Sequence, residues 1–376
     1  MAHTLTRSRL ALCSIFFAWG CSYAMWGAHI PTLQARLSIE PAALGLALLA
    51  FGLGCVVAQP VMAFFVARHG SRFCTVVGSL INAIIFPTPI LAPSVPLLFL
   101  ATFAFGFSAS LTFVAANTQA TEFEIIRGRP TMSFFHGFFS LGALAGSAAG
   151  GALVTAGLGD GSGAVSAAAL MIVVTLIATP YLLPSRQPKA TVGPVFALPS
   201  RALIDLAAIA FLCNMVEGAV IDWSALLLAL DKGASSGGAA LGLTMYTAAM
   251  AATRFYSGPI VYRIGDRKVV TLGALLMALG VSIAVFAPLP LLSAVGFGVV
   301  GIGAANNVPV LVSAGGRTPG VVASVGVAAV GTSALVGFLI APPLIGFVAN
   351  FAGLRAGVGL LAAIALAGAA ASASRQ

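Results

Sequence analysis

Charged side chains are scarce in this sequence. Asp, Glu, Lys and Arg make up 7% of its 376 residues, whereas a soluble domain carries roughly 25%. This scarcity excludes a soluble globular domain, and a hydrophobic share of 60% excludes intrinsic disorder. Five cysteines without a CxxC pair are too few for a disulfide scaffold and predict small buried side chains. The composition therefore predicts that lipid surrounds most of the chain.

Acidic residues number nine against eighteen basic ones, which gives a net charge of +9. The basic residues occur in twos between apolar stretches, whereas a nucleic-acid surface needs them clustered, so no nucleic-acid partner is predicted. The sequence contains no HExxH or Walker pattern and no nucleophile–base or metal-ligand constellation. We therefore predict that the chain is not an enzyme and needs no cofactor or metal, with a proton gradient as its energy source.

Long apolar stretches recur along the chain, each long enough for a membrane-spanning helix of about 20 residues. They predict an all-α integral membrane protein with the lipid bilayer as partner. The twelve predicted spans are 10–33, 42–67, 73–92, 95–121, 130–156, 163–183, 202–230, 239–262, 269–287, 290–314, 319–349 and 353–371.

Basic residues are divided unequally between the loops of this arrangement. With the N-terminus inside, fourteen are cytoplasmic, and Arg36, Lys232 and Arg355 are outside. The positive-inside rule therefore predicts cytoplasmic N- and C-termini. The apolar run after Arg7 and Arg9 is followed by no A-x-A site, which indicates an uncleaved first span.

The longest polar stretch, residues 184–201, contains four prolines and predicts a cytoplasmic linker. It separates an N-terminal six-helix bundle, 1–183, from a C-terminal one, 202–376. Short matches between the halves support an internal repeat, which is typical of secondary transporters with the site between the halves. The matches are A-L-G-L at 43–46 and 240–243, R-x-G-x-R at 68–72 and 263–267, and A-A-N at 115–117 and 304–306.

Twelve spans, the repeat, a basic central loop and an R-x-G-x-R loop after spans two and eight resemble the major facilitator superfamily. E-G-x-x-x-D-W-S at 217–224 and H-G-x-x-S-L-G at 136–142 are similar to a bacterial inner-membrane branch of it. The resemblance implies two pseudo-symmetric bundles and alternating access. It also implies that the R-x-G-x-R residues pin the cytoplasmic gating loops, although Ala67 and Tyr262 replace the family's Asp. Those residues are Arg68, Gly70, Arg72, Arg263, Gly265 and Arg267.

Two ionisable residues of the second half lie deep in predicted spans, where a charge costs at least ~2.5–3.5 kcal/mol. Glu217 lies about fifteen residues into span seven, and we predict that it carries a proton, because desolvation disfavours its charged form. The alternative is a structural carboxyl hydrogen-bonded between helices. Arg254 on span eight is always charged, and it pairs with Glu217 or binds an anionic substrate, or else forms a fixed structural ion pair.

Two further ionisable residues are weaker candidates for proton coupling. Asp222 lies about 140° around the helix from Glu217. We expect it to pack near the outer end, where it can reach water more easily than Glu217, or to contact another helix. His136 follows Pro130 by six residues, and an ordinary pKa near 6.5 suits a proton relay. The alternative for His136 is a solvated or helix-packing side chain.

The resemblance implies a cavity lined by spans 1, 4, 7 and 10. Trp19, Tyr23 and Trp26 share one face of span 1, where aromatic rings stack on sugars or cations, or pack in the core. The predicted polar binding residues are amides, which bind a solute or join helices. These amides are Asn117, Asn214 and Asn306, of which the first and last are related by the A-A-N match.

These features together predict a monomeric proton-coupled symporter of a small polar, sugar-like solute. Its partners are lipid, protons and the small-molecule substrate. A drug/proton antiporter is the alternative, because Gly142-x-x-x-Gly146-Ser147-x-x-Gly150-Gly151 resembles the superfamily's antiporter motif G-x-x-x-G-P-x-x-G-G. A non-transporting membrane receptor or scaffold is a third hypothesis from another class, and such proteins usually carry an added soluble domain.

Overall fold

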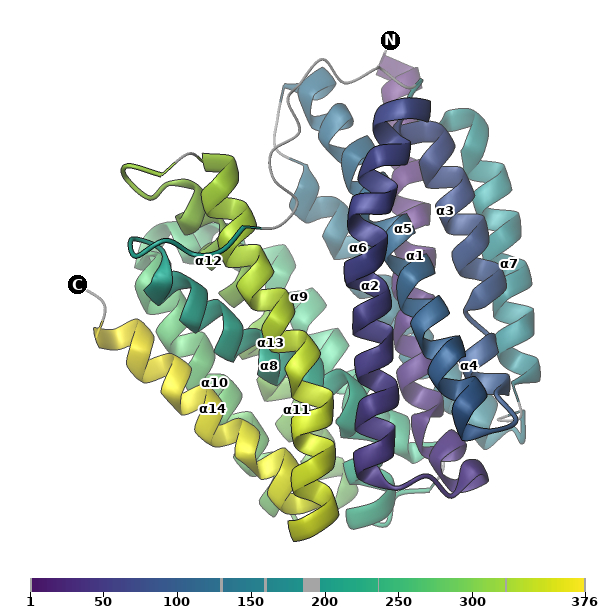
Figure 1. Cartoon of the computed structure of the whole chain (residues 1–376), viewed down its shortest axis with the longest axis vertical. Helices are drawn as coiled ribbons and strands as arrows, with labels where there is room; N and C mark the ends of the chain where they lie inside the picture. Colours follow the sequence, from purple (N-terminus) through teal and green to yellow (C-terminus); the bar gives the residue numbers. More distant parts are fainter. Residues whose placement is uncertain are drawn as a thin grey trace. The chain divides into compact units, whose positions relative to one another are not determined.

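The structure is a computed structural model that describes residues 2–128, 131–158, 161–184, 197–235, 237–321 and 323–374. Most of the predicted linker, residues 185–196, therefore lies outside the described residues. Within these ranges the regular elements are all helical (Figure 1). The α-helices are α1 (Ala2–Leu37), α2 (Pro41–His69), α3 (Ser71–Ile85), α4 (Thr88–Leu91), α5 (Val95–Arg127), α6 (Met132–Thr155), α7 (Ser162–Ala178), α8 (Ile204–Leu226), α9 (Leu241–Ile264), α10 (Asp266–Phe286), α11 (Pro290–Ala304), α12 (Asn307–Gly316), α13 (Ala323–Ala352) and α14 (Leu354–Ser374).

Each predicted span overlaps one of these helices or two consecutive ones. Eleven stretches of the described residues are helical, long and apolar enough to cross a membrane. The helix α9, which covers the predicted span 239–262, is not among the eleven. The all-α membrane class is confirmed, whereas the count of twelve spans and the cytoplasmic termini stay predictions.

Proline and glycine explain several helix boundaries. The third predicted span is interrupted because α3 ends at Ile85 and α4 begins at Thr88, with Pro87 between them. Proline lacks the N–H that a continuous helix needs. The helix α5 ends at Arg127, and the next residue, Gly128, has a left-handed φ of 68° that favours glycine.

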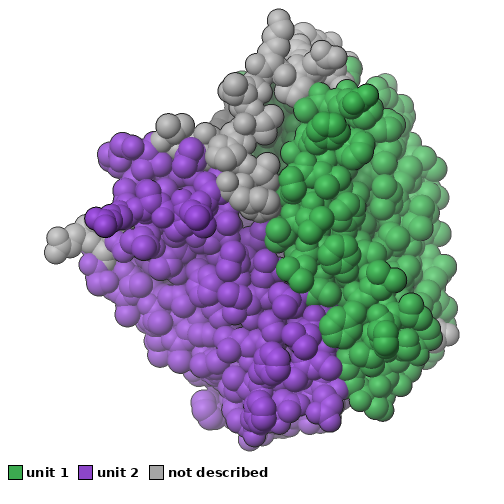
Figure 2. Space-filling view, in the orientation of Figure 1, with its two compact units in different colours: residues 1–39, 50–191 green, residues 40–49, 192–376 purple. Residues whose placement is uncertain are grey.

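The described chain divides into two compact units (Figure 2). Unit 1 comprises residues 1–39 and 50–191, and unit 2 comprises residues 40–49 and 192–376. In unit 1, α1 packs against α5, α6 and α7, and α3 packs against α5. In unit 2, α8 packs against α12, α13 and α14, and α10 packs against α11. In each unit, therefore, the first of these helices packs against several later helices of the same unit, and Figure 1 shows where the labelled helices lie along the chain.

Close helix contacts repeat between the units at a fixed separation. A Cβ atom on Gly142 would collide with the backbone of Phe17, and one on Gly337 would collide with the backbone of Phe211. Only glycine lets the helix pairs α1–α6 and α8–α13 approach so closely. The two glycines are 195 residues apart and the two phenylalanines 194. We call this separation of 194 to 196 residues the packing register.

The packing register corrects one inference from the sequence. The R-x-G-x-R loops follow it, since Gly70 and Gly265 are 195 residues apart. Asn117 and Asn306 are 189 residues apart, so the A-A-N match lies six residues outside the register. The two asparagines are therefore not structurally equivalent, and the match reflects a composition rich in alanine.

Candidate functional site

The strongest predicted site residues meet inside unit 2. Glu217 lies in the middle of α8 and Arg254 on α9, and both side chains are half-buried. An electrostatic interaction joins the carboxylate to the guanidinium. The residues next to Glu217 in the chain, Val216 and Gly218, are buried, so the acid lies between apolar neighbours. In such surroundings each charge depends on the other for compensation.

Arg254 also contacts a break in the tenth predicted span. The sequence predicts one helix over 290–314, but α11 ends at Ala304 and α12 begins at Asn307. The Arg254 Nε donates a hydrogen bond to the carbonyl oxygen of Ala305 over 3.2 Å. A carbonyl freed by a helix break needs a new donor when water is excluded, and Arg254 supplies it. One guanidinium thus connects Glu217 to the broken helix.

Two buried polar residues of this site escaped the sequence analysis. Tyr246 on α9 is 1% exposed, lies within electrostatic reach of both Glu217 and Arg254, and its hydroxyl has no partner among the described residues. Asn307 is 1% exposed and donates through Nδ2 to the Met277 sulfur over 3.1 Å, while its Oδ1 is likewise without a described partner. Tyr246 lies eight residues before Arg254, so both lie on the same face of α9. This spacing in the sequence could have indicated that Tyr246 belongs to the site.

The other predicted residues of unit 2 have different surroundings. Asp222 is 6% exposed, which contradicts the expectation that it reaches water and agrees with the alternative that it packs against another helix. The helices packed around α8 bury it, which its distance from the helix end does not indicate. Asn214 donates to the Ala334 carbonyl on α13 over 2.8 Å and thereby joins two helices. Asn306 is half-buried and begins α12 as its N-cap residue.

Unit 1 brings together two other predicted residues. His136 on α6 and Asn117 on α5 share a hydrogen bond of 3.0 Å between Nε2 and Oδ1, in which the imidazole is the donor. The Asn117 Nδ2 donates to the Phe113 carbonyl over 2.8 Å, which fixes the amide orientation. The His136 ring also meets the edge of Phe16, at 5.3 Å between centroids. His136 is therefore partly buried in the helix bundle of unit 1.

The aromatic residues of span 1 divide between two surroundings. Trp19 and Tyr23 both contact Phe139, with ring centroids 4.3 Å and 6.4 Å apart, and both are half-buried. Trp26 is 2% exposed and packs edge-on against Phe105. Because Trp26 is closed off by its neighbours, it belongs to the core of unit 1.

The two R-x-G-x-R loops have matching geometry. Gly70 and Gly265 precede α3 and α10 with φ of 82° and 80°, a region that favours glycine. The Arg72 guanidinium donates to the Thr179 carbonyl over 3.0 Å, at the end of α7. Arg267 donates in the same way to the Ala373 carbonyl, at the end of α14. Each loop therefore caps the last helix of its own unit, where cations are favoured.

The remaining loop contacts also follow the packing register. In unit 1 the Ser71 hydroxyl donates to Glu122 over 2.6 Å, and in unit 2 Asp266 pairs with Arg317 over 2.6 Å. The first arginines of the two motifs, Arg68 and Arg263, are exposed.

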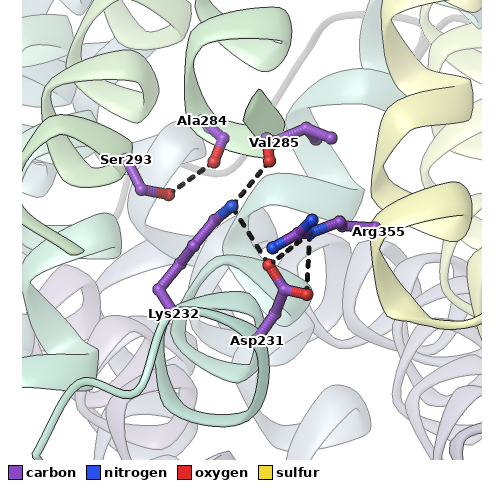
Figure 3. Close-up of polar contacts among 6 residues, drawn as sticks. All are labelled: Asp231, Lys232, Ala284, Val285, Ser293 and Arg355. Carbon is purple, nitrogen blue, oxygen red and sulfur yellow. Dashed lines mark hydrogen bonds and ion pairs between the residues drawn. The ribbon is translucent and has the colours of Figure 1, made fainter. Parts of the chain in front are cut away.

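A second pair of equivalent caps was missed by the sequence analysis. Arg36 donates to the carbonyl oxygens of Ile90 and Ala92, over 2.7 Å and 2.8 Å, at the end of α4. Lys232 donates to the Val285 carbonyl over 2.6 Å, near the end of α10 (Figure 3). Arg36 and Lys232 are 196 residues apart, and Ile90 and Val285 are 195 apart, so the contact repeats.

The glycines of the antiporter-like motif on α6 contact α1. Cβ atoms on Gly142 and Gly146 would collide with the backbones of Phe17 and Cys21, and one on Gly150 would lie 2.8 Å from the Ala28 Cβ. Close packing accounts for these glycines, so the motif does not distinguish an antiporter from a symporter.

Comparison with known proteins identifies the family. The family model of the Major Facilitator Superfamily matches residues 10–226 and 206–374. The chain belongs to this superfamily. An MFS-type transporter of Yersinia pestis is 32% identical over 352 residues, covering 93% of this chain and 91% of the relative. The chain is therefore an integral membrane protein and a transporter, not an enzyme.

Solved structures share the fold of this superfamily member. The nucleoside transporter NupG aligns with a TM-score of 0.75 at 15% identity, covering 97% of this chain and 98% of NupG. The fucose:proton symporter of E. coli aligns with a TM-score of 0.63 at 16% identity, covering 98% of both chains. At these identities the likeness concerns the fold alone.

Proposed function

We propose that this superfamily member is a proton-coupled symporter of an uncharged, polyhydroxylated solute, acting as a monomer in a bacterial inner membrane. The observation that supports the proposal most is that Arg254 interacts electrostatically with Glu217 and donates a hydrogen bond to the carbonyl at the α11–α12 break. Of Glu217 and Arg254, only Glu217 changes its charge with pH, since arginine stays protonated. An acid inside a membrane is a functional candidate by default.

The proposed coupling uses the charge on Glu217. Protonation of Glu217 removes the negative charge that faces Arg254, and the same guanidinium holds the Ala305 carbonyl at the helix break. Proton loading thereby changes the electrostatic restraint on a discontinuous span, and such spans form the binding sites of many transporters. Alternating access of the two bundles then carries proton and solute together.

The proposed substrate class rests on the polar groups near this acid and on the named structural neighbours. The Tyr246 hydroxyl and the Asn307 Oδ1 supply a donor–acceptor and an acceptor, which suit solute hydroxyl groups. The structural neighbours are named for a nucleoside and for fucose with a proton. Both are ring compounds with several hydroxyl groups, so nucleosides and sugars are the first solutes to test.

The test reconstitutes the purified chain in liposomes that contain a pH dye. Nucleosides, sugars, organic acids, amino acids and lipophilic cations are added outside, to the wild type and to Glu217→Gln. We expect a nucleoside or sugar to acidify the interior, and we expect the variant to lose that acidification. Counterflow of labelled solute across equal pH should survive in the variant, because binding and exchange need no net proton movement.

One control variant, two further test variants and three alternative outcomes complete the test. Asp205→Asn changes an exposed acid on the same helix, α8, and should leave acidification intact. Asp222→Asn tests the second acid of α8, and His136→Gln tests the proton relay predicted for unit 1. Alkalinisation on solute addition would mean antiport. Normal acidification by Glu217→Gln would contradict the proposal. A wild type that none of the solutes acidifies would contradict it as well.

A further inference from the structure

An apolar groove runs between α10 and α14 of unit 2. Its volume is about 330 Å³, which lies within the range of small-molecule sites. Its apolar walls are formed by Val281, Val285, Phe286, Ala356, Gly359 and Ala362. The α14 side is shallow because it presents glycine and alanine, and Phe286 at the end of α10 is 82% exposed. Both helices are long and apolar enough to cross a membrane, so the groove opens toward the surroundings of two candidate spans.

One charged side chain, Arg355, lines the end of this groove. Its Nε lies 2.9 Å from Asp231, and its side chain is 61% exposed (Figure 3). Among the described residues this is its one polar contact, which leaves the terminal guanidinium nitrogens for another acceptor. The other polar lining residue, Ser282, donates its hydroxyl to the Ala278 carbonyl over 2.8 Å. Arg355 is therefore the lining residue that can donate hydrogen bonds to the polar part of a ligand.

The neighbouring charges leave this end of the groove positive. Lys232 lies 3.1 Å from Asp231 and donates to Val285, and its side chain is 2% exposed. Two cations thus face one carboxylate, a net charge of +1, and the exposed cation is Arg355 (Figure 3). Asp231 closes a π-helical turn, Leu227–Asp231, that carries it toward both cations.

We propose that this groove binds an anionic phospholipid. Its acyl chain lies between α10 and α14, and its phosphate accepts hydrogen bonds from the terminal nitrogens of Arg355. A guanidinium matches phosphate geometry through its planar fork of donors, and the apolar walls match a hydrocarbon chain. An apolar groove beside a single exposed cation fits an amphiphile better than a small soluble anion, which would leave the apolar walls without a partner.

The experiment measures lipid retention and thermal stability of the full chain in detergent. Native mass spectrometry counts lipids retained after addition of phosphatidylglycerol or phosphatidylcholine. We expect the wild type to retain one phosphatidylglycerol and to unfold at a higher temperature with it than with phosphatidylcholine. Arg355→Gln should weaken phosphatidylglycerol binding about fivefold, the effect of one basic group near an anionic lipid surface.

Two further variants separate the groove from the charge. Gly359→Leu fills the groove while Arg355 remains, so it should also lose phosphatidylglycerol, and Gly359→Ala is the milder version because a Cβ there meets Val285 at 3.9 Å. Arg317→Gln is the matched control, since Arg317 is 62% exposed and also pairs with an aspartate, Asp266, but is not among the residues that line the groove. It should retain the lipid.

Other outcomes would overturn the lipid assignment. Equal retention of phosphatidylglycerol by the wild type, Arg355→Gln and Gly359→Leu would place the lipid elsewhere. Equal stabilisation by soluble glycerol phosphate would indicate an anion site without an acyl chain. A dimer that Gly359→Leu converts to monomers would mean that a second copy of this chain occupies the groove.

Discussion

Units 1 and 2 pack their helices in one register but hold different side chains at equivalent positions. In unit 2, Tyr246 and Arg254 both lie within electrostatic reach of Glu217. At 195 residues earlier, unit 1 has Phe51 in place of Tyr246 and Gln59 in place of Arg254. Its described polar contact between predicted site residues is the hydrogen bond of His136 to Asn117. The repeat therefore preserves the contacts between helix backbones, while the charged chemistry is concentrated in unit 2.

The largest expected change in stability comes from replacing Arg254 by glutamine, the residue at the equivalent position 59 of unit 1. Arg254→Gln leaves Glu217 without its opposite charge, and we expect the free energy of unfolding to fall by about 3 kcal/mol. Thermal unfolding in detergent measures the loss. The double variant Glu217→Gln/Arg254→Gln should recover most of it, because no charge is then left unpaired. Additive losses in the double variant would mean that the two residues are not coupled.

The packing glycines should respond equally in both units. Gly142→Ala and Gly337→Ala each place a Cβ against a backbone, and we expect each to lower the free energy of unfolding by about 1–3 kcal/mol. Gly331→Ala is the control, since a Cβ there meets nothing within 4 Å. Thermal unfolding of the three variants checks this. A large loss in one unit alone would show that the shared register does not imply shared packing energy.

Tyr246→Phe gives unit 2 the side chain of Phe51. The buried hydroxyl has no described protein partner, so its removal should leave stability unchanged or raise it by about 1 kcal/mol. Solute uptake should fall about tenfold, equivalent to ~1.4 kcal/mol, if the solute uses that hydroxyl. Uptake and melting temperature are measured together, with Phe51→Tyr as the matched change in unit 1. Unchanged uptake would exclude a solute contact at this hydroxyl.

The smallest effects belong to the arginines that cap α7 and α14. Arg72→Gln and Arg267→Gln should each lower the free energy of unfolding by about 0.3–1 kcal/mol, the usual value of a cation at a helix C-terminus. Arg68→Gln is the control, because Arg68 makes no hydrogen bond among the described residues. The measurement is chemical unfolding of the wild type and the three variants under identical conditions, because differences of this size need a direct comparison. Equal stability of all three variants would argue against the capping role.

The sequence predicted the superfamily, the helices and the R-x-G-x-R loops because these depend on local pattern. Apolar length predicts a span, and glycine at positions 70 and 265 is required by a positive φ. The sequence also indicated Glu217 and Arg254, since charges inside spans are costly. These predictions need no knowledge of which helices are neighbours.

The features that the sequence did not predict depend on contacts between helices. The break after Ala304 carries a local signal that we did not use, because Pro309 lacks the N–H that would bond the Ala305 carbonyl in a continuous helix. The donor that replaces this N–H, Arg254, comes from another helix and could not be predicted locally. Asp222 is buried by the helices around α8 and not by its position along it. The A-A-N match led to the wrong inference that Asn117 and Asn306 are equivalent, because alanine is common in this chain. The packing register, which comes from helix contacts, shows that they are not equivalent.

The buried ammonium of Lys232 determines how membrane orientation can be measured chemically. The sequence contains three lysines, Lys189, Lys232 and Lys268. Lys232 is the one predicted to lie outside, yet its side chain is 2% exposed and engaged by Asp231 and Val285. A membrane-impermeant amine reagent would therefore leave Lys232 unmodified from either side. Lys268 is exposed, so its modification in intact cells or inverted vesicles reports the orientation that Lys232 conceals.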